Sequence, residues 1–157
     1  MSFSKENYVA RIANASPLQL IIINFEIIID YINASKKYIK TKDKNFDFNI
    51  QKARQFLLEL RSSLNMEYEI SFNLMAIYNF IDSQLAKYLF NENIEIADDC
   101  IKILNTILEG FKGIEEQEEN KDSLMENTHQ IFAGLTYNKN GTLEEFIDTD
   151  TNRGFKA

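Results

Sequence analysis

The sequence contains very few of the residues that break helices or crosslink a chain. Among its 157 residues there are one proline, Pro17, and five glycines, four of which lie at or after position 113. Cys100 is the only cysteine, so an internal disulfide is excluded. The scarcity of breakers up to about residue 110 favours a mostly helical body that needs neither a disulfide nor a metal to fold.

The sequence also lacks basic patches, a secretory signal and an uninterrupted apolar run. Its formal net charge of −7 makes nucleic acid and anionic membrane surfaces poor partners. The N-terminus has no basic region followed by an apolar stretch. The most apolar run, residues 20–32, is interrupted by Asn24, Glu26 and Asp30, and we expect it to be too short and too polar to insert into a membrane. These features predict a cytoplasmic protein.

Reactive side chains are too few for a convergent catalytic site. His129 is the only histidine, and Glu126 precedes it with the Glu-x-x-His spacing of carboxylate-bridged metal bundles. Such bundles need two of these motifs and two more carboxylates. Phosphotransfer through His129 is a second alternative, which labelled phosphate and a cognate kinase would test. The sequence has no glycine-rich phosphate loop and no cysteine pair. It therefore predicts no enzyme, no metal and no cofactor.

The strongest local signal predicts a helix from Ser16 to about Lys40. Ser16 suits the N-cap and Pro17 the first helical position, and Gln19 completes a capping box. One face is expected to be wet and carries Glu26, Asp30, Asn33 and Lys37. Much of the remaining surface is covered by Leu20, Ile21, Phe25, Ile27, Ile28, Tyr31, Ile32 and Ile39. Because this apolar sector is wide, more than one neighbour or partner must cover it.

Three further amphipathic segments predict helices over about 48–64, 68–90 and 94–111. The first has a seam of Ile50, Ala53, Leu57, Leu60 and Leu64; the second of Ile70, Leu74, Ile77, Ile81, Leu85 and Tyr88; the third of Ile94, Ala97, Ile101, Leu104, Leu108 and Phe111. Cys100 lies beside the last seam and is interpreted as a small apolar filler. Short polar connections make sequential helices antiparallel, so the predicted fold is all-α, an up-down four-helix bundle.

The segments outside this bundle are weaker. Residues 1–15 are interpreted as an N-terminal arm, residues 16–112 as the bundle domain, and residues 113–157 as a C-terminal extension with an acidic linker. The extension has a weak helical stripe at Leu124, Thr128, Ile131 and Leu135, and a predicted turn at Asn140-Gly141. Its apolar residues Phe146, Ile147 and Phe155 motivate the hypothesis that it folds back onto the bundle or recruits a second partner.

Two stretches carry motifs of a known family. Residues 14–34 contain Ala15-Ser16-Pro17, Leu20-Ile21, Phe25-Glu26 and Ala34, and residues 57–85 contain Glu59-Leu60-Arg61-Ser62-Ser63-Leu64, Asn73-Leu74 and Ile77-Tyr78. Over about residues 5–111 the chain resembles the flagellin export chaperones of the FliS family. It departs where the family usually has Leu-Tyr-acidic-Gly, here Asn24-Phe25-Glu26-Ile27, and where Met66-Glu67-Tyr68-Glu69 replaces a Gly-Gly pair.

The resemblance implies a non-enzymatic chaperone with the C-terminal segment of flagellin and a component of the export gate as partners. Such proteins prevent early polymerisation and deliver flagellin to the flagellar type III export apparatus, and their N-terminal arm can lie over the apolar groove that flagellin occupies. The residues expected to contact the partner are Tyr8, Ile12, Leu20, Phe25, Leu74, Ile77, Tyr78 and Ile81. Ser16 and Pro17 are interpreted as capping residues rather than contacts. The resemblance leaves open whether the free protein forms a homodimer.

Physical reasoning alone reaches a similar surface but not its exact lining. A bundle with excess apolar residues can hold the apolar anchors of an extended or helical segment. The excess lies in the first helix and in the aromatic residues Phe72, Tyr78, Phe80 and Tyr88, but periodicity does not separate groove residues from ordinary core. The alternative is a helical adaptor with another partner. A flagellin gene next to the gene for this chain would favour the chaperone over that alternative.

Asn24 is the sharpest departure from the apolar pattern of the first helix. At 100° per residue it lies nearly opposite Glu26, the centre of the expected wet face. A buried amide must be hydrogen-bonded or it lowers stability. We expect an internal partner such as a tyrosine or another amide; the alternative is the backbone of a bound partner.

Overall fold

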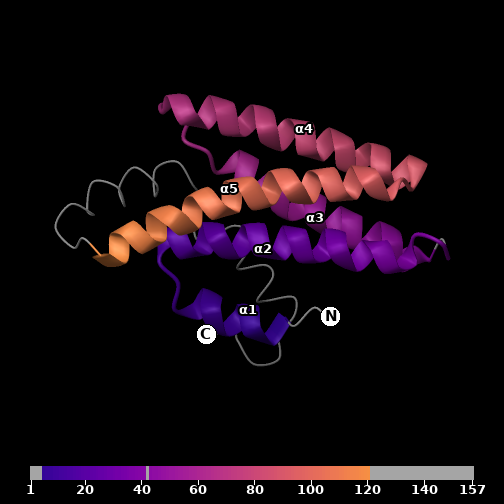
Figure 1. Ribbon diagram of the computed structural model, residues 1–157, viewed down its shortest axis with the longest axis horizontal. Helices are drawn as coiled ribbons and strands as arrows, with labels where there is room; N and C mark the ends of the chain where they lie inside the picture. The colour runs from indigo at the N-terminus through magenta and orange to yellow at the C-terminus, as the bar shows by residue number, and fades with distance from the viewer. Residues whose placement is uncertain (1–4, 42, 121–157) are drawn as a thin grey trace.

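The computed structural model describes residues 5–41 and 43–120, which are helical throughout apart from short connections (Figure 1). Its elements are α1 Lys5–Ala13, α2 Pro17–Ser35, the 3₁₀ helix η1 Lys36–Tyr38, α3 Lys44–Ser62, α4 Glu69–Asn91 and α5 Ile94–Asn120. The predicted all-α class is confirmed. The predicted stripe over 124–135, the Glu126–His129 motif and the turn at Asn140-Gly141 lie outside the described residues.

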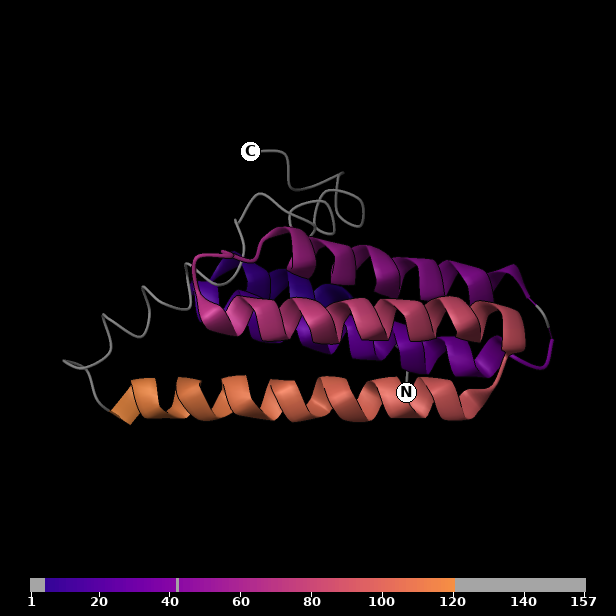
Figure 2. The same ribbon diagram turned by 90° about the horizontal axis from the view of Figure 1, so that it is seen from above.

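Four long helices form the bundle, and α1 lies outside it against α2 (Figure 1 and Figure 2). Helix α2 packs on α3 and α5, and α4 packs on the same two helices from the other side. Helix α1 therefore lies on the side of α2 away from α4. Glu92, with a left-handed φ of 50°, ends α4 and lets α5 begin two residues later in the opposite direction.

The start of α2 follows the predicted chemistry closely. The Ser16 side chain accepts a hydrogen bond from the Gln19 backbone N–H at 3.2 Å, and the Gln19 side chain accepts from the Ser16 N–H at 2.9 Å. Pro17 occupies the first turn, where no donor is needed. Two N–H groups that would otherwise lack partners are thereby satisfied, which fixes where α2 begins.

We expect Ser16→Ala to lower the free energy of unfolding by about 1 kcal/mol, because it removes this cap. Urea denaturation followed by circular dichroism would measure the change. Ser83→Ala is the matched control, since the Ser83 hydroxyl donates only to the Phe80 carbonyl of its own helix. An equal loss in both variants would show that Ser16 does not stabilise the start of α2.

Helix α2 is buried along most of its length and supplies the largest share of the core. Its buried residues include Leu18, all the isoleucines from Ile21 to Ile32, Phe25 and Tyr31. The longer helix Pro17–Tyr38, which contains the run 20–32, is long and apolar enough to cross a membrane by length and composition alone. However, 72% of this window is buried inside the bundle, as in the core helix of a soluble protein.

Three helix boundaries differ from the sequence prediction. Helix α2 gives way to η1 at Lys36 instead of continuing to Lys40. Helix α3 begins at Lys44, four residues early, because the Asp43 carboxylate caps it by accepting from the Asn45 N–H at 3.0 Å. Helix α5 continues past Phe111 to Asn120, through the acidic run that was predicted to be a linker segment.

The remaining seams form the core largely as predicted. On α3 the first four seam residues are buried, and on α5 the buried residues are Ala97, Cys100, Leu104, Leu108 and Phe111. Burial raises the pKa of the Cys100 thiol to about 12, in keeping with its role as an apolar filler. On α4, by contrast, Ile70 is exposed and Ile77 is only half-buried. Apolar side chains of the predicted seam are therefore left partly exposed to solvent on α4.

Candidate partner-binding surfaces

The residues predicted to line a groove lie mostly inside the bundle. Six of them are buried: Tyr8 on α1, and five in the core of the bundle, Leu20, Phe25, Leu74, Tyr78 and Ile81. The Phe25 ring packs against Tyr78 of α4 and Phe111 of α5, with centroids 6.1 Å and 5.6 Å away. Ile77 and Ile12 remain half-buried. A partner could reach the five core residues only if helices separated, so their direct binding role stays a prediction.

Helix α1 covers half of the α2 face that was predicted to be wet: Glu26 and Asp30 are half-buried, whereas Asn33 and Lys37 are exposed as expected. Tyr8 and Val9 of α1 are buried in the contact with α2, and Ile12 of the same helix is half-buried. The Tyr8 hydroxyl donates to Asp30 at 2.5 Å, and the Arg11 guanidinium donates to Glu26 at 2.5 Å. The isolated α1 has nine residues, too few for a stable helix in water. Its structure thus depends on contacts with α2.

The ionisable side chains that join α1 to α2 have shifted pKa values. Burial raises the pKa of Asp30, and the hydrogen bond from Tyr8 offsets this only in part. Burial, together with Asp30, raises the pKa of the Tyr8 phenol, so it remains a proton donor at any physiological pH. Hydrogen bonding to Glu26 raises the pKa of Arg11, and Lys112 of α5 lies 3.8 Å from the same carboxylate. Glu26 thereby links α1, α2 and α5.

We expect Asp30→Asn to raise the melting temperature at pH 7 more than at pH 3. The folded pKa of Asp30 lies above its unfolded value, so the folded state holds its proton more tightly. Stability from this group is present below the unfolded pKa and falls as pH rises through the folded pKa. An asparagine removes that loss and leaves an oxygen that can accept from Tyr8. Thermal melts of both proteins at the two pH values test this; a larger gain at pH 3 would contradict it.

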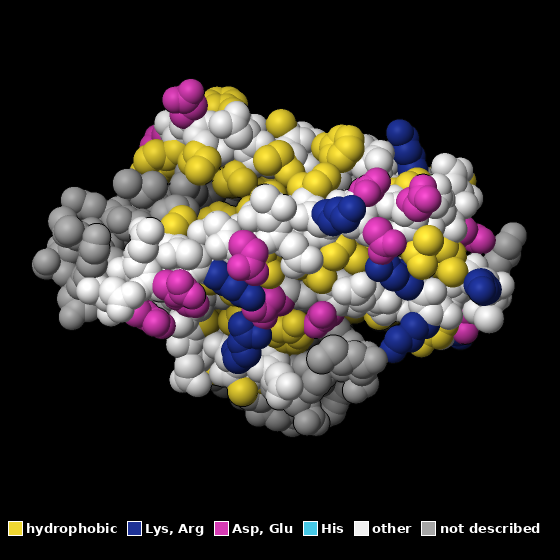
Figure 3. All heavy atoms as spheres, in the orientation of Figure 1, with side chains coloured by type: hydrophobic (Ala, Val, Ile, Leu, Met, Phe, Trp, Pro, Cys, Tyr) yellow, Lys and Arg dark blue, Asp and Glu magenta, His cyan; other side chains and the backbone are white. Residues whose placement is uncertain are grey.

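The exposed apolar side chains of the bundle concentrate on α4. Phe72, Phe80 and Phe90 are 59%, 51% and 90% exposed, while Tyr78 and Tyr88 of the same helix are buried. Only two of the four aromatic residues predicted as excess are therefore on the surface. Figure 3 shows apolar side chains gathered along α4 and between α4 and α5. On α5, Ile103 and Ile107 are half-buried beside this strip.

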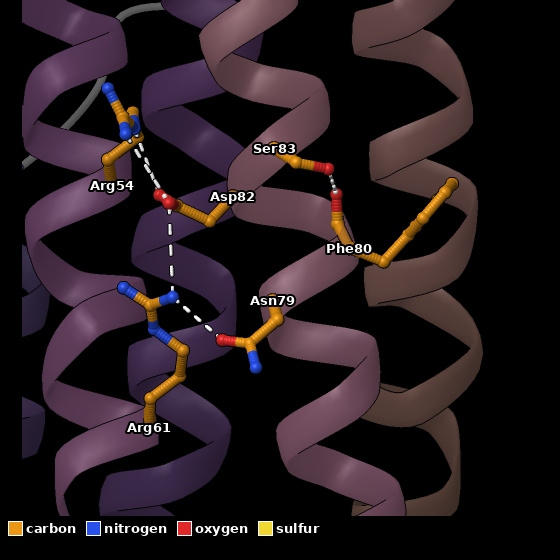
Figure 4. A network of polar contacts seen from close by, with 6 residues as sticks. All are labelled: Arg54, Arg61, Asn79, Phe80, Asp82 and Ser83. Carbon is orange, nitrogen blue, oxygen red and sulfur yellow. Dashed lines mark hydrogen bonds and ion pairs between the residues drawn. The ribbon is translucent and has the colours of Figure 1, made fainter.

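The opposite flank of α4 is closed by a polar cluster with α3. Arg54 donates to both Asp82 carboxylate oxygens, at 2.9 Å and 3.3 Å, and Arg61 donates to Asn79 at 2.8 Å (Figure 4). Arg61 also lies 3.9 Å from Asp82. Phe80 points away from this cluster, toward the α5 side (Figure 4). These long-range pairs hold α4 on α3, and the sequence analysis did not identify them.

Asn24 is fully buried without any hydrogen-bond partner. Neither its amide nitrogen nor its oxygen has one, so the expected internal partner was wrong. The physical reason is that the core of the bundle is mainly apolar. The hydroxyls of the two other buried polar residues in the described part of the chain, Ser35 and Ser71, bond to the backbone carbonyls of Ile32 and Asn65. The amide is therefore a local weakness in the most buried helix.

Within residues 5–41 and 43–120, no group of three or more His, Cys, Asp or Glu side chains could hold a metal ion. The candidate site is thus a set of apolar surfaces. The chain matches the family described as "Flagellar protein FliS" over residues 3–118. No curated protein matches it. That match spans α1 to nearly the end of α5, and the chain belongs to the FliS family of flagellar export chaperones.

Proposed function

We propose that this chain is a cytoplasmic export chaperone that binds the C-terminal segment of flagellin. In this role it prevents premature polymerisation and delivers flagellin to the flagellar type III export apparatus, where a gate component is a second partner. The family match carries the proposal, because it extends from α1 to all but the last two residues of α5. The family consists of chaperones rather than enzymes.

The α1-covered face of α2 is the surface that we assign to flagellin. Helix α1 is short, and it contacts α2 through one buried tyrosine, one valine and two polar links. An incoming amphipathic helix could place its own apolar residues where Tyr8 and Val9 now lie. Because α1 occupies the surface in the free protein, the partner must displace it, and the apparent affinity is lowered accordingly.

The polar links of α1 would make this displacement reversible. Arg11 is paired with Glu26 at a partly exposed position, where such pairs contribute little. When α1 leaves, Glu26 still has Lys112 within 3.8 Å, so its own carboxylate is not left without a cation. Asp30 loses its Tyr8 partner but regains water, which removes its burial penalty. The polar groups therefore do not trap α1 on the bundle.

Calorimetric titration of the full chain with a peptide covering roughly the last forty residues of the same organism's flagellin tests the proposal. We expect one-to-one binding with a negative heat-capacity change, because apolar surface is buried on association. A scrambled peptide of the same composition is the control. Absence of binding at high micromolar concentration, both with residues 1–14 present and with them deleted, would favour a helical adaptor with a different partner.

A further inference from the structure

The α4–α5 apolar surface, formed by Phe72, Ile77 and Phe80 of α4 and Ile103 and Ile107 of α5, remains open with every described helix in place. Phe72 is 59% exposed and Phe80 51%, and the other three are half-buried. It lies on the far side of the bundle from α1 (Figure 1). A contiguous apolar surface on a soluble bundle marks an interaction site.

The two helices place these residues next to one another. Helices α4 and α5 are antiparallel and are separated by two residues, so Phe80 lies level with Ile103 and Ile107. Asp98 and Lys112 reach α2 from one flank of α5, and the two isoleucines lie on the other flank, toward α4. Farther along, a Cβ added to Gly110 would meet nothing within 4 Å, so the surface stays open near Phe72.

The chain itself supplies a segment at the right place to cover this surface. Helix α5 ends at Asn120, about 6 Å beyond the level at which α4 begins, and residues 121–157 follow. Phe72, in the first turn of α4, is therefore close to where the extension starts. A dozen extended residues span about 40 Å, so the whole surface lies within reach. A tethered segment also has an effective concentration in the millimolar range, which makes weak contacts sufficient.

The sequence of the extension fits the surface. Leu124, Ile131 and Leu135 repeat at helical spacing, and from Leu124 to Leu135 a helix would be about 17 Å long. Phe72 and Phe80 are about 12 Å apart along α4. The family match ends at residue 118, so the extension is additional to the family's shared part. We propose that residues 121–135 dock on the α4–α5 apolar surface of the same molecule through Leu124, Ile131 and Leu135.

A spin label on α4 tests this with the full chain and without flagellin. A nitroxide is attached to Ser83→Cys, which is exposed on α4, while the buried Cys100 stays unlabelled. We expect the amide signals of residues 124–135 to be lost in the oxidised state and to return on reduction. In the double variant Phe72→Ser/Phe80→Ser, the amide signals should persist in both the oxidised and the reduced protein. Phe48→Ser/Leu58→Ser is the matched control, because both side chains are 50% exposed on α3, and it should behave like the parent.

Circular dichroism melts show whether each variant stays folded, and Ile131→Ser/Leu135→Ser provides the reciprocal change, with the same expected recovery of signals. Signals that survive in the oxidised parent would overturn the proposal. So would a signal loss that grows with protein concentration, since it would assign the surface to a second copy of the chain. Because flagellin is absent, either failure leaves the chaperone proposal to be judged by the titration alone.

Discussion

Replacing Asn24 with leucine should raise the free energy of unfolding by about 2–3 kcal/mol. The Asn24 amide is fully buried, and neither of its polar atoms has a hydrogen-bond partner. Each unsatisfied group costs about 1–3 kcal/mol, and leucine removes both while adding apolar contacts in a similar volume. The family usually has leucine at this place. For a domain of this size the melting temperature should rise by roughly 5–10 °C.

Asn33→Leu is the matched control, since Asn33 lies on the same helix but is exposed. It should change stability by less than about 0.5 kcal/mol. Both variants can be compared by urea denaturation, with the m-value used to check that the unfolding transition is unchanged. A loss of stability in Asn24→Leu would mean that the amide has a partner in solution, such as an ordered water.

The same residue shows what sequence reasoning can and cannot reach. Helical phase correctly placed Asn24 opposite Glu26, and hence in the core, but it could not show which groups of the neighbouring helices would surround it. Partners between helices depend on their relative register, which one sequence does not reveal. The Arg54–Asp82 pair was missed for that reason. Local features such as the Ser16 capping box need only neighbouring residues, and they were predicted correctly.

For the candidate surfaces too, helical phase predicts the exposure of some residues but not of others. Tyr78 is in phase with Leu74, Ile81 and Leu85, and it is buried with them; Phe72 lies on the opposite side of α4, and it is exposed. A stricter use of helical phase would have separated these aromatic residues. The cover that α1 provides over Glu26 and Asp30 could not be found in this way, because a carboxylate on a polar face looks solvated in any single helix.

The end of the last predicted helix was set too early, at about Phe111, because composition was given more weight than propensity. The composition changes after Lys112, and the acidic run there suggested a linker. Glutamate and glutamine are good helix formers, and an exposed glycine in a helix costs only about 1 kcal/mol. Lys112 also faces Glu26 on α2, which helps to hold this part of α5 on the bundle. The helix therefore continues to Asn120.

Tyr8→Ala should strengthen the apparent binding of the flagellin C-terminal peptide by tenfold or more. Tyr8 is buried against α2 and donates to Asp30, so its loss removes both apolar burial and a hydrogen bond from the α1 contact. If flagellin must displace α1, each 1.4 kcal/mol removed from that contact lowers the apparent dissociation constant tenfold, until α1 is fully released. Calorimetric titration of the variant and the parent measures the ratio.

The direction of the change decides between two roles for this tyrosine. Asn7→Ala is the control, because Asn7 is exposed on the same helix and its loss should leave the affinity unchanged. Weaker binding by Tyr8→Ala, with Asn7→Ala unaffected, would mean that the tyrosine contacts flagellin directly, as the sequence analysis expected. Stronger binding would mean that α1 competes with flagellin for α2, because a residue that contacts the partner cannot be removed with a gain in affinity unless it also holds the competing helix in place.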